Sequence, residues 1–144
     1  MSVSDVVVRP AAAADRHHIW RLTRELAVSF VPQRHVFDAS FDALLAVPGN
    51  LLLVADSPTQ AVVGYVLASH HMTFFANGPV AWVEELIVDQ QARNRGAGRA
   101  LMSGVEDWAR SLGAAYVSLA TRRAATFYTA IGYEESAAFF RKLL

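Results

Sequence analysis

The sequence contains no cysteine among its 144 residues. This absence excludes disulfide bridges, zinc sites built on thiolates and cysteine nucleophiles. Charge is also scarce, because Asp, Glu, Lys and Arg make up only 18% of the chain and thirteen basic residues balance thirteen acidic ones. A chain without net charge has no general attraction to nucleic acid or to acidic membranes.

Long apolar runs are missing as well. No segment reaches the roughly 18 unbroken apolar residues of a membrane span. The N-terminal residues MSVSDVVVRP lack the basic region and apolar stretch of a secretory signal. We therefore expect a soluble, cytoplasmic protein with neither a nucleic-acid nor a membrane partner. No repeat or long linker divides the chain, and its length suits one domain over 1–144 with a sizeable core.

Apolar residues nonetheless supply 53% of the chain, and their spacing predicts several helices. Asp15 is placed to cap a first helix. A clearly amphipathic helix is expected over about 98–112, with Gly113 placed to end it. The other expected helices are short, at 41–46 after a loop over 30–37 and from 121 to 131.

Strand-like apolar runs lie between these helices. They are expected at 5–9, 51–56, 61–71, 80–89 and 114–120, with two short β-like pieces in the tail from 133 to 144. The turn at SPTQ favours an antiparallel hairpin between the second and third runs. The order of elements predicts an α/β fold, a single-domain mixed and largely antiparallel sheet flanked by helices.

The most distinctive segment is RNRGAGRALM at 93–102, where three arginines and two glycines precede the helix expected at 98–112. A helix start leaves backbone N–H groups unpaired and carries partial positive charge, so it suits a phosphate. Gly96 and Gly98 would let a bulky anion approach those amides. Arg93, Arg95 and Arg99 would add attraction or bidentate contacts. The alternative is a flexible connector with solvated arginines.

Two common phosphate-binding motifs do not fit this segment. A P-loop requires G-x-x-x-x-G-K-[ST], which the chain lacks. A dinucleotide fingerprint requires G-x-G-x-x-G, but position 101 is Leu. It also requires an acidic residue at the end of the next strand, where Ala120 and Thr121 stand. Both nucleotide interpretations are therefore disfavoured.

Two motifs instead resemble those of one enzyme family. Arg93–Gly98 has the form R-x-x-G-x-G after ELIVD, and it resembles motif A of the GNAT N-acetyltransferases. FYTAIGYEE at 127–135 resembles the late Y-x-x-x-G-[FY] segment of the same family. The resemblance extends from Val6 to Tyr133 in the family's order of elements. It implies the GNAT fold.

The resemblance also implies acetyl-CoA as cosubstrate. The pyrophosphate would lie on the amides of 94–99, and the pantetheine arm would pair with main-chain groups beside a splayed strand. The implied contacts are Leu86, Ile87, Val88, Arg93, Asn94, Arg95, Gly96, Ala97, Gly98 and Arg99. Thr121 stands where many relatives have an asparagine that contacts the coenzyme arm, and a threonine there departs from the family pattern but could supply a hydroxyl instead. No metal is expected.

Tyr128 matches the tyrosine that the family commonly uses to protonate the coenzyme A sulfur. A phenol with a pKa of about 10 is a suitable donor to a thiolate whose unperturbed pKa is about 8.5. The alternative is that Tyr128 only packs, because Ala124, Tyr128 and Ile131 share one helical stripe.

The general base is expected on the strand VAWVEELIV. Alternation places Glu84 with Leu86 and Val88 on one face, and Val83 with Glu85 on the other. An apolar setting raises a carboxyl pKa toward the range useful for proton abstraction. Only one glutamate should face the acetyl group, and we slightly favour Glu84. The alternative is that both are paired or edge-exposed without a catalytic task.

The resemblance also implies that the acceptor site is shaped by the first two helices and their loop, roughly 19–46, together with the hairpin ends and the tail. The region around that loop holds three phenylalanines and several polar residues. These are Phe30, Phe37, Phe41, Arg34, His35 and Asp38. The sequence thus favours an N-acetyltransferase that transfers the acetyl group of acetyl-CoA directly to a primary amine of a small molecule or peptide. The alternatives are a non-catalytic acyl-CoA-binding or sensing module and a nucleic-acid binder, which the balanced charge disfavours. Assembly as a homodimer stays open.

Overall fold

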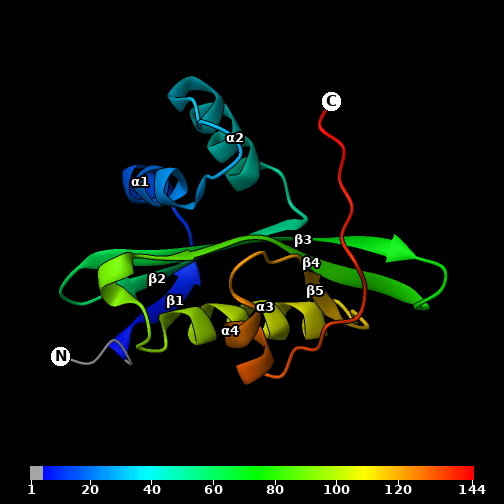
Figure 1. The fold of residues 1–144 in the computed structure, drawn as a ribbon. Coiled ribbons are helices and arrows are strands. Elements are labelled where there is room, and N and C mark those ends of the chain that lie inside the picture. The colour runs from blue at the N-terminus through cyan, green and yellow to red at the C-terminus, as the bar shows by residue number, and fades with distance from the viewer. Residues whose placement is uncertain (1–4) are drawn as a thin grey trace.

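The computed structural model describes residues 5–144 as a central sheet with helices on both faces (Figure 1). The sheet has five strands in the order β1-β2-β3-β4-β5. Neighbouring strands are antiparallel except β4 and β5, which are parallel. The strands are β1 (Val7–Pro10), β2 (Asn50–Ser57), β3 (Ala61–Thr73), β4 (Gly78–Val88) and β5 (Val117–Leu119).

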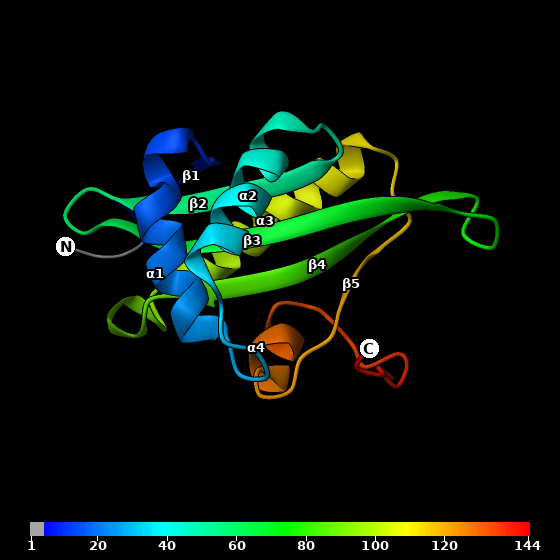
Figure 2. The same cartoon turned by 90° about the horizontal axis from the view of Figure 1, so that it is seen from above.

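Helices cover the two faces unequally. α1 (Arg16–Leu26) and α2 (Arg34–Ala46) lie over one face, and the long α3 (Ala97–Ser111) crosses the other face with the short α4 (Ala125–Ala130) beside it (Figures 1 and 2). Short 3-10 turns, η2 (Ala13–Asp15) and η3 (Gln90–Ala92), precede α1 and α3. The mixed, largely antiparallel fold predicted from the sequence is confirmed.

Each helical layer buries its own core against the sheet. On the α3 face, Leu101, Met102 and Val105 are fully buried against the inner strands. On the α1–α2 face, Leu22 and Phe41 pack over Tyr65 of β3. No helix within residues 5–144 is both long and apolar enough to cross a bilayer.

A β-bulge interrupts β4 at Glu84. Leu67 of β3 pairs with Glu85, whereas the next residue, Ala68, pairs with Val83, so Glu84 has no partner in the ladder. One extra residue reverses the alternation of side chains beyond it. The predicted face of Val83 was therefore wrong, because Val83 packs on the α3 side together with Leu86 and Val88.

Two further sequence predictions were wrong. α2 begins at Arg34, so the second half of the loop expected at 30–37 is helical. The second helix is therefore longer than the expected 41–46. The tail from 133 to 144 forms no strand. β5 is only three residues long, and the tail instead crosses the molecule, with Phe139 stacked on Trp82 at 6.0 Å and Arg141 donating a hydrogen bond to Ser29.

Asp15 is the N-cap residue of α1, as predicted, but its carboxylate does not cap the helix. It accepts a bidentate pair of hydrogen bonds from Arg9, at 2.8 and 2.9 Å, and a third from the main-chain nitrogen of Ala12. Hydrogen bonding to Arg9 lowers the pKa of this buried carboxyl. Arg9 also contacts Asp56 on β2, so one arginine ties the start of α1 to the sheet.

Candidate functional site

The sheet opens between β4 and β5, and we call this opening the β4–β5 gap. The two strands pair only where Ala81–Val83 meets Val117–Leu119. β4 then continues to Val88 while the chain after β5 turns away, and Figure 2 shows the two segments diverging. The second half of β4 thus has no strand partner on this side among the described residues, and buried main-chain groups require partners.

The bulge decides which main-chain groups of β4 face the gap. Before it, the nitrogen of Ala81 bonds to Tyr116 beside β5, so odd-numbered positions face that side. After it, Asp89 bonds to Val63 of β3 and the Ile87 carbonyl lies against Gly64 of β3. In a strand, the N–H and C=O groups of successive residues point to opposite sides. Among the three predicted contacts, Leu86 and Val88 therefore face the gap, whereas the main chain of Ile87 faces β3.

The start of α3 lies at one end of the gap. Its first-turn amides, those of Ala97, Gly98 and Arg99, have no intrahelical acceptor, and the helix dipole adds partial positive charge there. Asn94 and Gly96 adopt left-handed conformations, with φ of 64° and 98°, which turn the chain into the helix.

Both glycines of the motif also have a local structural reason. Gly96 is the left-handed N-cap residue, and a Cβ there would meet nothing within 4 Å. At Gly98, a Cβ would lie 3.2 Å from Cζ of Phe127 on α4. Gly98 thus lets α4 pack against the start of α3, a role that sequence reasoning missed. The open space beside Gly96 remains compatible with close approach of an anion.

Several cations near the start of α3 and before α4 have no acidic partners among the described residues. Arg95 and Arg99 are exposed and form no ion pair within residues 5–144, and the same holds for Arg122 and Arg123 before α4. Arg93 donates from Nε to the main-chain oxygen of Val88 at 3.0 Å, which fixes the loop against β4. Together with the free amides, these side chains form a setting that favours a polyanion.

Tyr128 lies on α4 and joins the core cluster that includes Leu86 and Val88 at the gap. Its ring is half-buried and stacks edge-on with Phe127 and Tyr133. No hydrogen bond to its hydroxyl occurs in the described part of the chain, and burial raises its pKa. A phenol with a raised pKa stays protonated at neutral pH, so it is able to donate a proton.

Thr121 is occupied with local structure. Its Oγ1 accepts a hydrogen bond from the main-chain nitrogen of Ala124 at 3.0 Å, which closes the turn before α4. α4 itself begins at Ala125 rather than directly after Thr121. The hydroxyl proton of Thr121 is still available for another acceptor.

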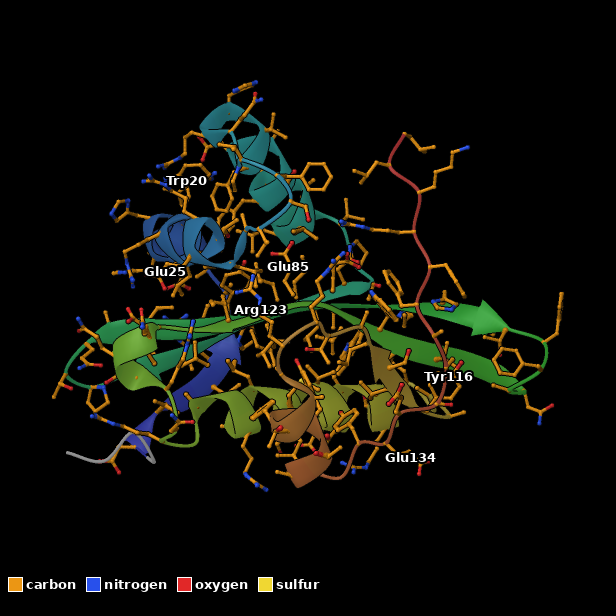
Figure 3. The ribbon with its side chains drawn as sticks, viewed as in Figure 1. Trp20, Glu25, Glu85, Tyr116, Arg123 and Glu134 are labelled. Atoms are coloured by element: carbon orange, nitrogen blue, oxygen red, sulfur yellow. The ribbon has the colours of Figure 1, made fainter. Side chains whose placement is uncertain are left out.

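The two glutamates of β4 differ in their surroundings. Glu84 is exposed, and its Oε2 accepts a hydrogen bond from the Trp82 indole at 2.7 Å. Glu85 is half-buried on the α1–α2 side of the sheet (Figure 3), where its Oε1 accepts from the Tyr65 hydroxyl at 2.7 Å. The geometry favours Glu85 over Glu84, which the sequence slightly favoured, as the glutamate placed to meet a ligand.

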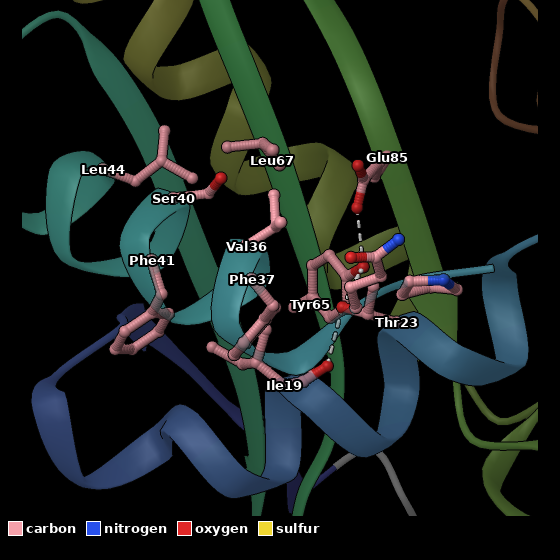
Figure 4. A pocket seen from close by; sticks show the side chains of 12 residues that line it. Ile19, Thr23, Val36, Phe37, Ser40, Phe41, Leu44, Tyr65, Leu67 and Glu85 are labelled. Carbon is pink, nitrogen blue, oxygen red and sulfur yellow. Dashed lines mark hydrogen bonds between the residues drawn. The ribbon is translucent and has the colours of Figure 1, made fainter. Parts of the chain in front are cut away.

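Glu85 opens into a cavity of about 230 Å³ between α1, α2 and the sheet, which we call the apolar pocket (Figure 4). Apolar side chains from both helices form most of its wall. Of the residues expected around the acceptor, Phe37 and Phe41 line this cavity, whereas Phe30, Arg34, His35 and Asp38 do not. Tyr65 and Thr23, which sequence reasoning missed, lie behind Glu85 with their hydroxyls 3.0 Å apart.

Comparison with known proteins identifies relatives of this sequence. Residues 16–133 match the model of the acetyltransferase (GNAT) family. Over 101 residues the chain is 32% identical to N-alpha-acetyltransferase 80 of Mus musculus. That match covers 69% of this chain but 31% of the mouse protein, so the chain spans about a third of that relative's length.

Solved structures share the fold. A putative acetyltransferase from Agrobacterium tumefaciens superposes with a TM-score of 0.84 at 23% identity, over 96% of this chain and 99% of the other. The structure of AAC(6')-Iy with the bisubstrate analogue CoA-S-monomethyl-acetylneamine gives a TM-score of 0.78 at 22% identity, over 96% and 99%. The family match covers most of the chain and the fold superposes on these neighbours, so the protein belongs to the GNAT family of acetyltransferases.

Proposed function

We propose that the protein is an N-acetyltransferase that moves the acetyl group of acetyl-CoA directly to a primary amine of a small molecule or peptide. The observation that carries this proposal is the β4–β5 gap, which joins the free amides of α3 to Tyr128 and to the glutamates of β4. Membership of the GNAT family supports acyl-CoA as donor. The complex of AAC(6')-Iy with a coenzyme A bisubstrate analogue supports it as well.

The phosphate end of acetyl-CoA would bind where α3 begins. The amides of 94–99 would hold the pyrophosphate, and Ala97, Gly98 and Arg99 contribute donors that have no intrahelical acceptor. Arg95 and Arg99 would add charge from their exposed side chains. Arg93 would act mainly by holding the loop to Val88, because its Nε is already bonded there.

The pantetheine arm would lie in the β4–β5 gap as a substitute strand. The main-chain groups of Leu86 and the nitrogen of Val88 face this space, and amide groups of the arm would pair with them, whereas the oxygen of Val88 already accepts from Arg93. Such pairing would also fix the acetyl carbonyl relative to the bulge at Glu84, where the strand changes direction.

The chemistry then needs one nucleophile, one base and one acid. The neutral amine attacks the thioester carbonyl, forming the C–N bond, and the C–S bond breaks. Glu85 would take the proton that the amine loses, directly or through water. Tyr128 would give its phenolic proton to the departing thiolate; burial raises the pKa of this phenol, so the proton is still in place when the C–S bond breaks.

Thiol release from acetyl-CoA, followed with a broad set of primary amines, tests the proposal. Amine-dependent release together with a stoichiometric acetylated product would support it. Thermal stabilisation by acetyl-CoA gives an independent measure of binding, since a ligand bound only by the native state raises stability by mass action. Stabilisation without release for any amine would favour a non-catalytic acyl-CoA-binding module, and absence of both would contradict the proposal.

A further inference from the structure

We infer that the acceptor is a compact monoamine whose nitrogen is attached to an apolar aromatic or branched group, and that the apolar pocket selects it. The inference rests on the proposed function and names the substrate class for the same site. Three features carry it: the single carboxylate of the pocket, the ion-paired acids next to its lining residues on α2, and its apolar wall.

The pocket offers one anionic position. Glu85 is the only charged residue among its lining side chains. Its Oε1 accepts the Tyr65 hydroxyl, whereas no hydrogen bond within residues 5–144 uses Oε2. Tyr65 is 1% exposed and donates to Glu85 from inside the core, so it holds the carboxylate in one orientation. The remaining oxygen has room for one ammonium or amine group.

The acids closest to the pocket in sequence are already paired. Asp38 of α2 accepts from Arg16 and Arg34, at 3.3 and 3.1 Å. Asp42, one turn later, pairs with Arg16. An acceptor with two or more amino groups would therefore find no free carboxylate beside α2 for its second charge, and removing a charge from water without a partner is unfavourable.

The wall of the pocket suits a small apolar group. Phe37 and Phe41 stack at 5.8 Å, and Val36 and Leu44 extend the same surface along α2. The volume of about 230 Å³ lies below the roughly 300–1,000 Å³ typical of pockets for drug-sized ligands. A phenyl or branched aliphatic group beside the amine would cover this surface, and the hydrophobic effect would favour its burial.

Matched amines test the inference directly. Phenethylamine and 3-methylbutylamine should give a kcat/KM at least about tenfold above that of ethanolamine or spermidine, in the range that a pocket gains from an apolar group. A peptide with an N-terminal phenylalanine, compared with phenethylamine, shows whether the group comes from a peptide or a free amine. Equal or higher kcat/KM for ethanolamine or spermidine would overturn the inference while leaving the acetyltransferase proposal intact. Absence of turnover with every amine would overturn both.

A second carboxylate should reverse the preference. Val36 lines the pocket with a side chain 52% exposed, so Val36→Asp adds an acid without emptying the core. Turnover of the diamine putrescine should then rise relative to phenethylamine by about tenfold, with unchanged acetyl-CoA binding. Leu45→Asp, on the same helix but outside the pocket, should leave the ratio as in the parent protein. An unchanged ratio in Val36→Asp, with intact thermal stability, would contradict the assignment of the pocket.

Discussion

The two halves of the candidate site are built from different parts of the chain. The half beside β5 uses main-chain groups of one continuous segment, from the second half of β4 into the first turn of α3. The apolar pocket on the opposite face uses side chains from α1, α2, β3 and β4, such as Thr23, Phe37, Tyr65 and Glu85. Main-chain donors do not depend on residue identity except where a glycine is required. The choice of amine can therefore change by side-chain substitution without disturbing cosubstrate binding.

Tyr128→Phe should have the largest effect and should separate chemistry from binding. Loss of the phenolic proton should lower kcat about 100-fold, within the range of general acid catalysis, while the acetyl-CoA Kd stays within twofold. Burial raises the pKa of Tyr128, so the parent enzyme should keep its activity up to the ordinary phenol range near pH 10. Steady-state kinetics and calorimetry provide both readouts.

Tyr116→Phe is the matched control for this change. Tyr116 is 42% exposed and lies near the end of the β3–β4 hairpin, outside the core cluster that contains Tyr128, Leu86 and Val88. Its substitution should leave kcat unchanged. If Tyr128→Phe kept full kcat as well, Tyr128 would only pack in the core and the acid would lie elsewhere.

Asp15→Asn should destabilise the attachment of α1, which lines the apolar pocket, to the sheet. The carboxylate of Asp15 is nearly buried and bonded to Arg9, so its loss should lower the free energy of unfolding by about 2 kcal/mol at pH 7. The pKa of Asp15 is lowered in the folded state, so this contribution is present above the unfolded pKa near 3.9. It is lost as pH falls through the lower folded value. Urea titrations at several pH values should show the parent–variant difference shrinking below about pH 4; a pH-independent difference would contradict the linkage.

Glu85→Gln should act on the acceptor half alone. Removing the negative charge should reduce kcat/KM for the best amine by about tenfold at pH 7, through loss of proton acceptance and of attraction to the amine. Glu84→Gln, whose side chain is exposed and held by Trp82, should change kcat/KM less than twofold. Equal effects of the two substitutions, or a larger effect of Glu84→Gln, would reassign the base.

The contrast between the halves also explains what the sequence could predict. The motif of Arg93–Gly98, Tyr128 and the order of elements lie in local patterns, and the predicted fold and family are confirmed. The bulge at Glu84 left no such pattern, because an extra residue in one strand is defined only against its partner strand. Tyr65 lies in the uniform apolar run AVVGYVLA, so its bond to Glu85, twenty residues away, has no local signal. The prediction of strands in the tail was wrong for a related reason. Its apolar residues suggest strands, but a strand also needs a partner, and β5 has only three paired residues.

Gly96→Ala should give the smallest effect. It tests whether the left-handed conformation of Gly96 is what positions the first-turn amides of α3 for acetyl-CoA. A Cβ at Gly96 meets nothing within 4 Å, but φ is 98°, so the variant should lose about 1 kcal/mol of stability through backbone strain. Gly49→Ala is matched, since Gly49 has φ of 110° and equally open surroundings in the turn before β2. Thermal unfolding should show similar losses for both variants. Only Gly96→Ala should also weaken acetyl-CoA, by about fivefold in calorimetry, because strain there tilts the first-turn amides of α3. Equal acetyl-CoA affinity in the two variants would mean that the phosphate lies away from those amides.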